Sequence, residues 1–256
     1  MFAPAAMLLM TASCATTQAD RSAWRPLFDG KTLTGWTPKI TGHPLGQDPD
    51  RIFTARDGTI RVSYANVPRF TGNFGHLHYR TPFTAYRLRL QYRFTGRALP
   101  GVEDWQHSNS GIMLHGQPPA TIGLAQQFPV SLEMQFLGAD RPKPEPSGNL
   151  CTPGTNVVMQ GKLITEHCTL STSPILPNAR WIRAEVEVTR TGQITHFIEG
   201  KPVLRYSAPQ YDPTDPDAKP LIAAASGRLA LRSGYISLQA EGHPVEFRNI
   251  EVKSLD

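Results

Sequence analysis

The chain has 256 residues, of which 39% are hydrophobic and 18% are charged, with 23 prolines and 21 glycines. This composition is typical of one large globular domain and excludes both a disordered chain and a membrane-spanning one. The formal net charge is +5, but Lys and Arg are scattered along the sequence. Nucleic-acid binding, which requires a concentrated basic surface, is therefore not expected.

The N-terminal segment MFAPAAMLLMTASC is apolar and ends in small residues before a cysteine. It resembles a bacterial lipoprotein signal, which predicts removal of residues 1–13, a lipidated Cys14 and a linker over residues 14–23. An ordinary secretory signal is the alternative, because no Lys or Arg precedes the apolar stretch. On either interpretation the protein is exported: to the periplasmic face of a bacterial membrane if lipidated, otherwise as a periplasmic or secreted protein. The segment is too short to span a bilayer, so only a lipid anchor would attach the chain to a membrane.

Alternating apolar and polar residues predict β-strands along the rest of the chain. Phe53–Val62 is typical of a hairpin with Asp57-Gly58 at its tip. Tyr86–Phe94 has apolar residues at every even-numbered position, as in a half-buried antiparallel strand. Further strands are predicted at Gly111–His115, Ser131–Phe136, Trp181–Val188, Gln193–Ile198, Val203–Tyr206, Gly227–Arg232, Tyr235–Glu241 and Val245–Val252. With no convincing helical period, the sequence predicts an all-β, two-sheet antiparallel sandwich in one domain, residues 24–256.

Residues 139–173 interrupt this pattern with a run rich in proline, glycine and polar residues. A segment of this kind in a compact sandwich is predicted to be a long loop over one sheet. Cys151 and Cys168 stand at either side of it. With Cys14 assigned to a lipid, they form an even pair in an oxidising compartment, which favours a disulfide. Two free buried thiols are the alternative.

The strand Ser131–Phe136 carries polar side chains at alternate positions. Because side chains two apart share a face, Ser131, Glu133 and Gln135 line one side of the predicted sheet and the apolar residues pack beneath. Such a polar row suits a hydroxyl-rich ligand, although a solvated sheet face has the same pattern.

Two histidines, His76 and His78, have the spacing that places both imidazoles on one side of a strand. With a nearby carboxylate, such as that of Glu133, they would hold one divalent metal, which is the only cofactor that the sequence suggests. Without a third ligand fixed by the sequence, ordinary core or surface histidines are the alternative.

Several segments, in order, resemble the 3-keto-disaccharide hydrolase family and span nearly the whole chain after the linker. They are Leu27–Trp36, Asn109–Ile112, Glu133–Gln135, and Leu238-Gln239 followed by Pro244–Ile250. The resemblance implies a concanavalin A-like jelly-roll fold and an enzyme that acts on sugars oxidised at C3. The cysteine pair suggests a distinct branch. The chain also has Gly138 where the family usually has Asp, and its His243 is displaced by two positions.

A carbonyl at C3 acidifies the C2–H bond of a sugar, so a base can remove that proton and the C1 substituent can leave. Addition of water then gives net hydrolysis. The chemistry requires a base, donors for the enolate oxygen and an acid for the leaving group. The residues nominated for catalysis are Glu133, His115, Glu241 and His243. Those nominated for carbohydrate binding are Asn109, Gln135, Gln239 and Ser131.

Two other functions fit the same residues. A lectin-like carbohydrate-binding module of this fold would bind sugars without turnover. A two-carboxylate glycosidase would use Glu133 and Glu241, provided that their carboxyl groups lie about 5–5.5 or 6.5–9.5 Å apart. The sequence leaves open which glycoside is bound, whether a metal takes part, whether bond cleavage is an elimination or a hydrolysis, and whether the protein self-associates.

Overall fold

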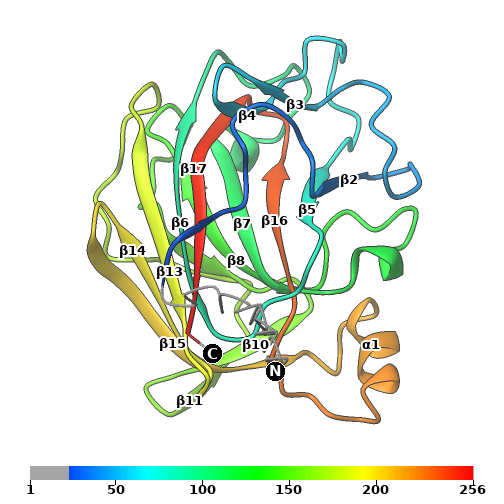
Figure 1. Cartoon of the computed structure of the whole chain (residues 1–256), viewed down its shortest axis with the longest axis vertical. Helices are drawn as coiled ribbons and strands as arrows, with labels where there is room; N and C mark the ends of the chain where they lie inside the picture. The colour runs from blue at the N-terminus through cyan, green and yellow to red at the C-terminus, as the bar shows by residue number, and fades with distance from the viewer. Residues whose placement is uncertain (1–22, 256) are drawn as a thin grey trace, which may run out of the picture.

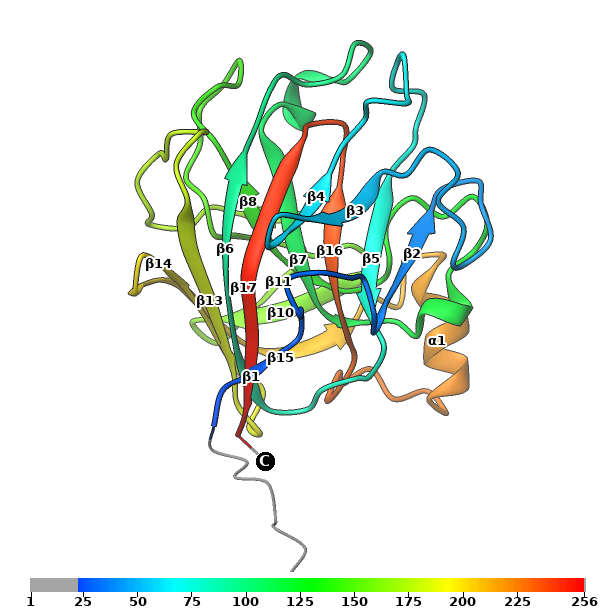
Figure 2. The ribbon, with the colours of Figure 1, turned by 45° about the horizontal axis from the view of Figure 1, so that its top comes forward.

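The computed structural model describes residues 23–255 and shows two antiparallel sheets packed face to face (Figures 1 and 2). This confirms the predicted all-β jelly-roll sandwich. The predicted signal peptide, the lipidation site Cys14 and most of the linker lie outside the described residues, so they stay predictions.

The larger sheet has ten strands, in the spatial order β11-β10-β15-β14-β13-β6-β17-β4-β3, and β1 pairs with β17. Their bounds are β1 (Arg25–Pro26), β3 (Phe53–Arg56), β4 (Thr59–Val62), β6 (Tyr86–Phe94), β10 (Thr155–Met159), β11 (Lys162–Ile164), β13 (Ile182–Val188), β14 (Gln193–Ile198), β15 (Lys201–Tyr211) and β17 (Val245–Ser254).

The smaller sheet has seven strands, in the order β12-β9-β8-β7-β16-β5-β2. Their bounds are β2 (Trp36–Ile40), β5 (Gly75–Tyr79), β7 (Asn109–Gly116), β8 (Leu132–Leu137), β9 (Asn149–Cys151), β12 (Cys168–Thr169) and β16 (Tyr235–Ala240). The helical elements are two 3₁₀ turns, η1 (Asp104–Gln106) and η2 (Pro119–Thr121), and the short α-helix α1 (Ala218–Ala224).

The core lies between the sheets and is built from the alternating apolar residues of both. Along β6 every even-numbered residue is buried and every odd-numbered one is partly exposed. In β8 the side chains of Leu132, Met134 and Phe136 join the same core. Phe136 stacks on Tyr92 of β6 with ring centroids 4.1 Å apart. The inward face of β8 is therefore fixed by packing, which leaves its other face free for polar groups.

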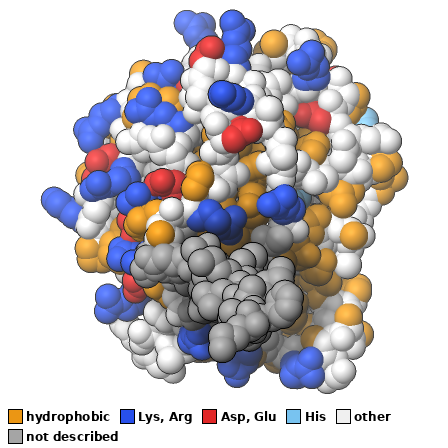
Figure 3. Space-filling model, viewed as in Figure 1, with side chains coloured by type: hydrophobic (Ala, Val, Ile, Leu, Met, Phe, Trp, Pro, Cys, Tyr) orange, Lys and Arg blue, Asp and Glu red, His pale blue; other side chains and the backbone are white. Residues whose placement is uncertain are grey.

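The outer face of the larger sheet carries ion pairs between neighbouring strands. Arg89 binds Glu251 at 2.8 Å and Arg93 binds Glu246 at 2.8 Å. Figure 3 shows Lys and Arg dispersed over one face of the molecule, with acidic side chains between them. The positive charge on this face is therefore distributed and partly neutralised.

Three predictions about the elements need correction. Residues 139–173 contain β9 to β12 in addition to loops, because strands of two to five residues are too short to show alternation. Gly227–Arg232 is not a strand and makes a single bridge, between Ala230 and Gln210. Helix α1 was missed because its seven residues span too few turns for a period to be recognised. Nowhere in residues 23–255 is there a helix with the length and apolar character needed to cross a bilayer.

The predicted disulfide is present: Cys151 and Cys168 are directly paired across β9 and β12 and are covalently joined. The bond closes a loop that contains β10 and β11 and holds the two-residue strand β12 at the edge of the smaller sheet. It thereby fixes the segment around His167 against β9.

We predict that the double variant Cys151→Ala/Cys168→Ala has a free energy of unfolding about 3 kcal/mol lower than the wild type. A crosslink of this loop length restricts the unfolded chain by about that amount. Urea unfolding measures the difference, and the reduced wild type is the matched control, since it should match the variant. Equal stability of the oxidised and reduced proteins would contradict the prediction.

Candidate active site

The outer face of the smaller sheet carries polar side chains in rows that cross the strands. Glu133 on β8 is paired with Cys151 on β9 and with Met113 on β7. Gln135 is paired with Asn149 on β9, whose Nδ2 donates to Gln135 Oε1 at 3.0 Å. Glu133 and Gln135 thus share the face opposite the core, as predicted.

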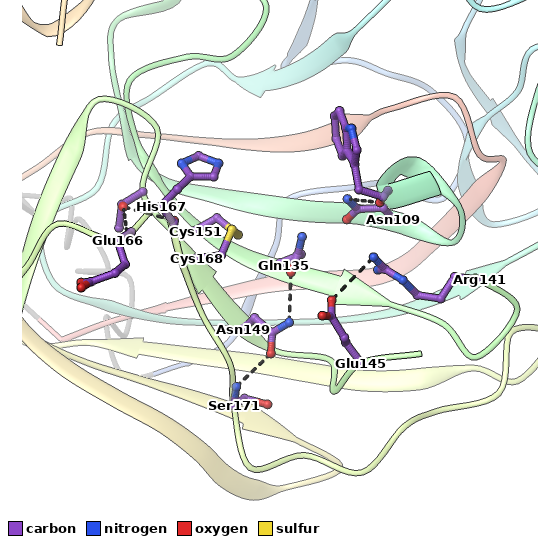
Figure 4. Close-up of a disulfide and its surroundings, with 12 residues drawn as sticks. Asn109, Gln135, Arg141, Glu145, Asn149, Cys151, Glu166, His167, Cys168 and Ser171 are labelled. Atoms are coloured by element: carbon purple, nitrogen blue, oxygen red, sulfur yellow. Dashed lines mark hydrogen bonds and ion pairs between the residues drawn. A yellow bond between two sulfur atoms is a disulfide. The ribbon is translucent and has the colours of Figure 1, made fainter. Parts of the chain in front are cut away.

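A cavity of about 600 Å³ lies over this part of the sheet. The polar side chains that line it come from β7, β8 and the loops beyond β8 and β16: Asn109, Glu133, Gln135, Arg141, Glu145 and Glu241. Figure 4 shows the disulfide on one side of Gln135 and the Arg141–Glu145 pair on the other. One wall of the cavity is formed by Cys151, Cys168 and His167. The segment around His167, which the disulfide holds against β9, therefore borders the site.

Gly111 of β7 makes room for the acidic residues. Its strand lies between β8, which carries Glu133, and β16, which leads to Glu241. A Cβ at Gly111 would collide with Glu133 Oε1 and lie 2.8 Å from Glu133 Cγ. Because glycine has no side chain, Glu133 leans across β7 toward Glu241. A glycine within a strand often marks such a close approach, and this was the available sequence signal.

Glu133 and Glu241 form a coupled pair of buried carboxyl groups. Burial and the charge of Glu241 raise the pKa of Glu133 well above its ordinary value. Burial raises the pKa of Glu241 to about 8, although Gln239 and Arg141 act in the opposite direction. Two carboxyl groups that share one desolvated place cannot both ionise easily. The pair therefore retains a proton at neutral pH.

Arg141 supplies positive charge beside this pair and was not predicted. Its side chain is 6% exposed, and Nη2 lies 3.6 Å from Glu145 Oε2. Its Nε and Nη1 atoms are buried without a hydrogen-bond partner in the described part of the chain. Burial lowers the pKa of Arg141, but an arginine stays charged under ordinary conditions. These two donors are available to an oxygen atom of a ligand.

Other polar atoms at the site are also unsatisfied. Within residues 23–255, the buried atoms without a hydrogen-bond partner include Glu133 Oε1, Glu241 Oε2 and Asn109 Oδ1. Most buried polar atoms in proteins have a partner. A group of unsatisfied donors and acceptors around one cavity therefore indicates a site built for a polar ligand.

Trp105 provides an apolar surface at the same cavity. It is 45% exposed and stacks nearly parallel on Phe74, with ring centroids 6.1 Å apart. Asn109 Nδ2 donates to Trp105 O at 3.0 Å and ties this residue to β7. A flat aromatic surface next to polar groups is the usual composition of a small-molecule site. Trp105 was not singled out from the sequence.

The sequence profile of the 3-keto-alpha-glucoside-1,2-lyase-like domain matches residues 23–253. The chain belongs to this family. This membership supports a carbohydrate-active protein, in agreement with the resemblance noted from the sequence motifs. No functionally curated protein shows significant sequence similarity to the chain.

Solved structures share the fold at low sequence identity. One candidate glycosyl hydrolase from Parabacteroides distasonis is 20% identical with a TM-score of 0.54, and the alignment covers 92% of this chain and 95% of that protein. A second one from the same organism is 16% identical with a TM-score of 0.54, and the alignment covers 91% of this chain and 100% of that protein. A Bacillus subtilis protein of unknown function with a galectin-like fold is 9% identical, covers 87% of this chain and 90% of its own, and has a TM-score of 0.51. These similarities establish the jelly-roll architecture.

Three residues nominated from the sequence lie away from the cavity. His115 has a left-handed φ of 49° where the β7–β16 register shifts, and its ring meets Tyr86 of the other sheet edge-on. His243 accepts a hydrogen bond at Nδ1 from the Ser108 N–H, 3.0 Å away, and its ring packs on Phe94. Ser131 is buried, and its hydroxyl donates to Pro129 O at 2.9 Å. None of the three lines the cavity that Glu133 faces.

The residues nominated for a metal are not brought together. His76 and His78 are buried on β5, and two strands, β16 and β7, separate them from Glu133 on β8. Three strand spacings correspond to about 14 Å of backbone separation. Within residues 23–255 no group of three or more His, Cys, Asp or Glu side chains is arranged to hold a metal ion. Of the nominated residues, the structure gathers Glu133, Glu241, Asn109 and Gln135 at the cavity, and Gln239 lies beside the two carboxyl groups.

We predict that Gly111→Ala lowers the affinity for a sugar ligand at least about tenfold, because the added methyl group displaces the Glu133 side chain. Gly58→Ala, in the turn of the β3–β4 hairpin of the other sheet, is the control for affinity, since an added Cβ there has nothing within 4 Å. Calorimetric titration with the ligand measures the effect. Wild-type affinity in Gly111→Ala would contradict the role assigned to this glycine.

The carboxyl pair also predicts a pH dependence of stability. Because the pKa of Glu241 is raised, the folded state keeps a proton at pH values where the unfolded state has released it. The resulting contribution to the free energy of unfolding is fully present below about pH 4.5 and is lost as pH rises toward about 8. Glu241→Gln should reduce that loss by up to about 1.4 kcal/mol per pH unit.

Urea unfolding from pH 5 to 9 measures the free energy of unfolding of the wild type and of the variant. The buried histidines titrate in both proteins, so their contribution largely cancels in the difference. Glu251→Gln, on the outer face of the other sheet, controls for the substitution itself. Parallel stability profiles of wild type and Glu241→Gln would refute the raised pKa.

Proposed function

We propose that the protein is an exported enzyme that cleaves 3-keto-glycosides by removing the C2 proton and expelling the C1 substituent. The observation that supports this most directly is the buried Glu133–Glu241 pair, which holds a proton at neutral pH beside the unused donors of Arg141. One ionised and one protonated carboxyl group are what a concerted or stepwise elimination requires.

In the proposed reaction the coupled pair carries one proton, and the reactive form is the one in which that proton is on Glu241 and Glu133 is ionised. In this form Glu133 takes the proton from C2. The electron pair of the C2–H bond forms the C2–C3 double bond and the C3 carbonyl oxygen becomes an enolate oxygen, which the Arg141 N–H donors stabilise. The enolate then collapses and the C1–O bond breaks, while protonated Glu241 donates its proton to the departing oxygen. The product is a 2-hydroxy-3-keto-glycal, and addition of water at C1 and a proton at C2 gives net hydrolysis.

Buried donors close to a developing oxyanion are worth more than they would be in water, because little solvent competes for the charge. Arg141 fits this role, since its side chain is almost entirely enclosed yet makes, among residues 23–255, a single long ion pair, with Glu145. Gln135, held by Asn149, is placed to accept or donate to a sugar hydroxyl. Trp105 offers its exposed ring to the apolar face of the sugar.

Glu133→Gln is expected to lower turnover of a 3-keto-disaccharide by about 10²–10⁴-fold, the usual contribution of a positioned base. In deuterated water, wild type and Glu241→Gln should both exchange the C2 hydrogen, but Glu241→Gln should accumulate little cleaved product. Glu133→Gln should do neither. Product formation and C2 exchange are both followed by NMR, and Glu251→Gln is the control that keeps full activity.

The same assays distinguish the other two functions. A lectin-like module would bind the sugar in calorimetry without exchange or cleavage. A two-carboxylate glycosidase would cleave the unoxidised disaccharide as well as the oxidised one. Each assay is run with and without added divalent metal ions, since the predicted metal would appear as a metal-dependent rate.

Export is part of the proposal. The Cys151–Cys168 disulfide supports it, because such bonds persist mainly in oxidising compartments. Fractionation of cells and labelling with a radioactive fatty acid test it, and Cys14→Ser should abolish labelling if the signal is of the lipoprotein type. Recovery of the chain in the cytosol would contradict export.

A further inference from the structure

A second cavity, of about 750 Å³, adjoins the one that holds the carboxyl pair. Phe128, Pro153 and His167 line both of them. The two hollows are therefore neighbouring parts of one cleft, divided at these three residues. The second part extends from there toward the residues that precede helix α1.

The wall of the second cavity is a fixed structure. Asp215 Oδ1 accepts hydrogen bonds of 2.9 Å from the backbone N–H groups of Asp217 and Ala218, which sets the start of α1. The Asp212 N–H donates to Gly154 O at 2.9 Å. Ala218 and Leu221 pack with Val130 in a small apolar cluster of their own. This cluster holds the helix beside the turn before β10, so the cavity is preformed.

Size indicates what the second cavity adds. Ligand sites usually have volumes of about 300–1,000 Å³, and each of the two cavities falls within that range alone. The cavity with the carboxyl pair has room for the reacting sugar and its nearest neighbour. The second cavity has room for further units of a longer substrate.

The charge of the second cavity restricts the chemistry of those units. Asp212, Asp215 and Asp217 line it, and no Lys or Arg is found among the described residues that do so. Burial, and to a lesser extent the charge of Asp215, raise the pKa of Asp217. Carboxylates and the hydroxyl of Thr165 suit the neutral hydroxyl groups of sugars, whereas a uronic acid would be repelled.

We propose that the cleft binds a neutral oligosaccharide of three or more units, oxidised at C3 of the sugar that reacts, with the units beyond the disaccharide in the second cavity. This rests on the proposed function of the carboxyl pair. It adds a binding site around Gln127 and Asp217 that sets the length and charge of the substrate.

The experiment compares three 3-keto substrates: a disaccharide, a trisaccharide of neutral hexoses, and the same trisaccharide with a uronic acid at its far end. Gln127→Trp fills the second cavity from an exposed position, and Gln47→Trp, exposed elsewhere, is its matched control. Asp217→Asn removes one negative charge. KM and kcat are measured for each protein with each substrate.

The wild type should have a KM for the neutral trisaccharide about tenfold below that for the disaccharide, and should discriminate against the uronic acid. Gln127→Trp should raise KM for the neutral trisaccharide to the value for the disaccharide and leave KM for the disaccharide unchanged. Gln47→Trp should leave both KM values unchanged. Asp217→Asn should improve KM for the uronic acid substrate by about threefold or more.

The failures can be told apart. If the disaccharide is cleaved but the trisaccharide has no advantage, or if Gln127→Trp affects both substrates equally, the second binding site is refuted and the proposed function stands. If no oxidised sugar is cleaved by any of the proteins, the proposed function fails and this inference fails with it.

Discussion

The burial of two carboxyl groups in one place is the constraint on which the site depends. Glu133 and Glu241 come from strands on either side of β7, and they approach each other because Gly111 leaves space between them. Removing charged groups from water is unfavourable unless they are paired or neutralised. In this chain part of the desolvation free energy is not compensated, since oxygen atoms of both residues lack a hydrogen-bond partner within the described part of the chain. Such an arrangement reduces stability and is typical of functional sites.

The surroundings hold this unfavourable pair in position. Gln106 Nε2 donates to the backbone oxygen of Glu241 at 2.9 Å, so η1 fixes the end of β16. On the other side, Cys151 is the strand neighbour of Glu133, and its disulfide fixes the wall of the cavity. His243 contributes indirectly, because its hydrogen bond to Ser108 holds the entry into β7. His243 thus helps to position β7, the strand that carries Gly111.

Strand periodicity was sufficient to predict the sandwich and the face on which Glu133 and Gln135 lie, because both follow from the two-residue repeat. The family motifs added Glu241. The same argument placed Ser131 on this face, but Ser131 is buried and its hydroxyl donates to Pro129 O. His115 lies away from the cavity, with a left-handed φ at a register shift of β7. Arg141 and Trp105 could not be predicted in the same way. They lie in connecting segments, whose path over the sheet depends on tertiary contacts and has no periodic signal.

The protonation of the pair bears on the choice between an enzyme and a binding module. A lectin-like site needs satisfied or solvent-exposed hydrogen-bonding groups, and amides or ionised carboxylates provide them without a raised pKa. A carboxyl group with a pKa raised toward neutrality can both take and give a proton, and the raised pKa lowers stability at neutral pH. The elevated pKa of Glu241 next to a buried arginine with free donors therefore favours acid–base catalysis over sugar binding alone.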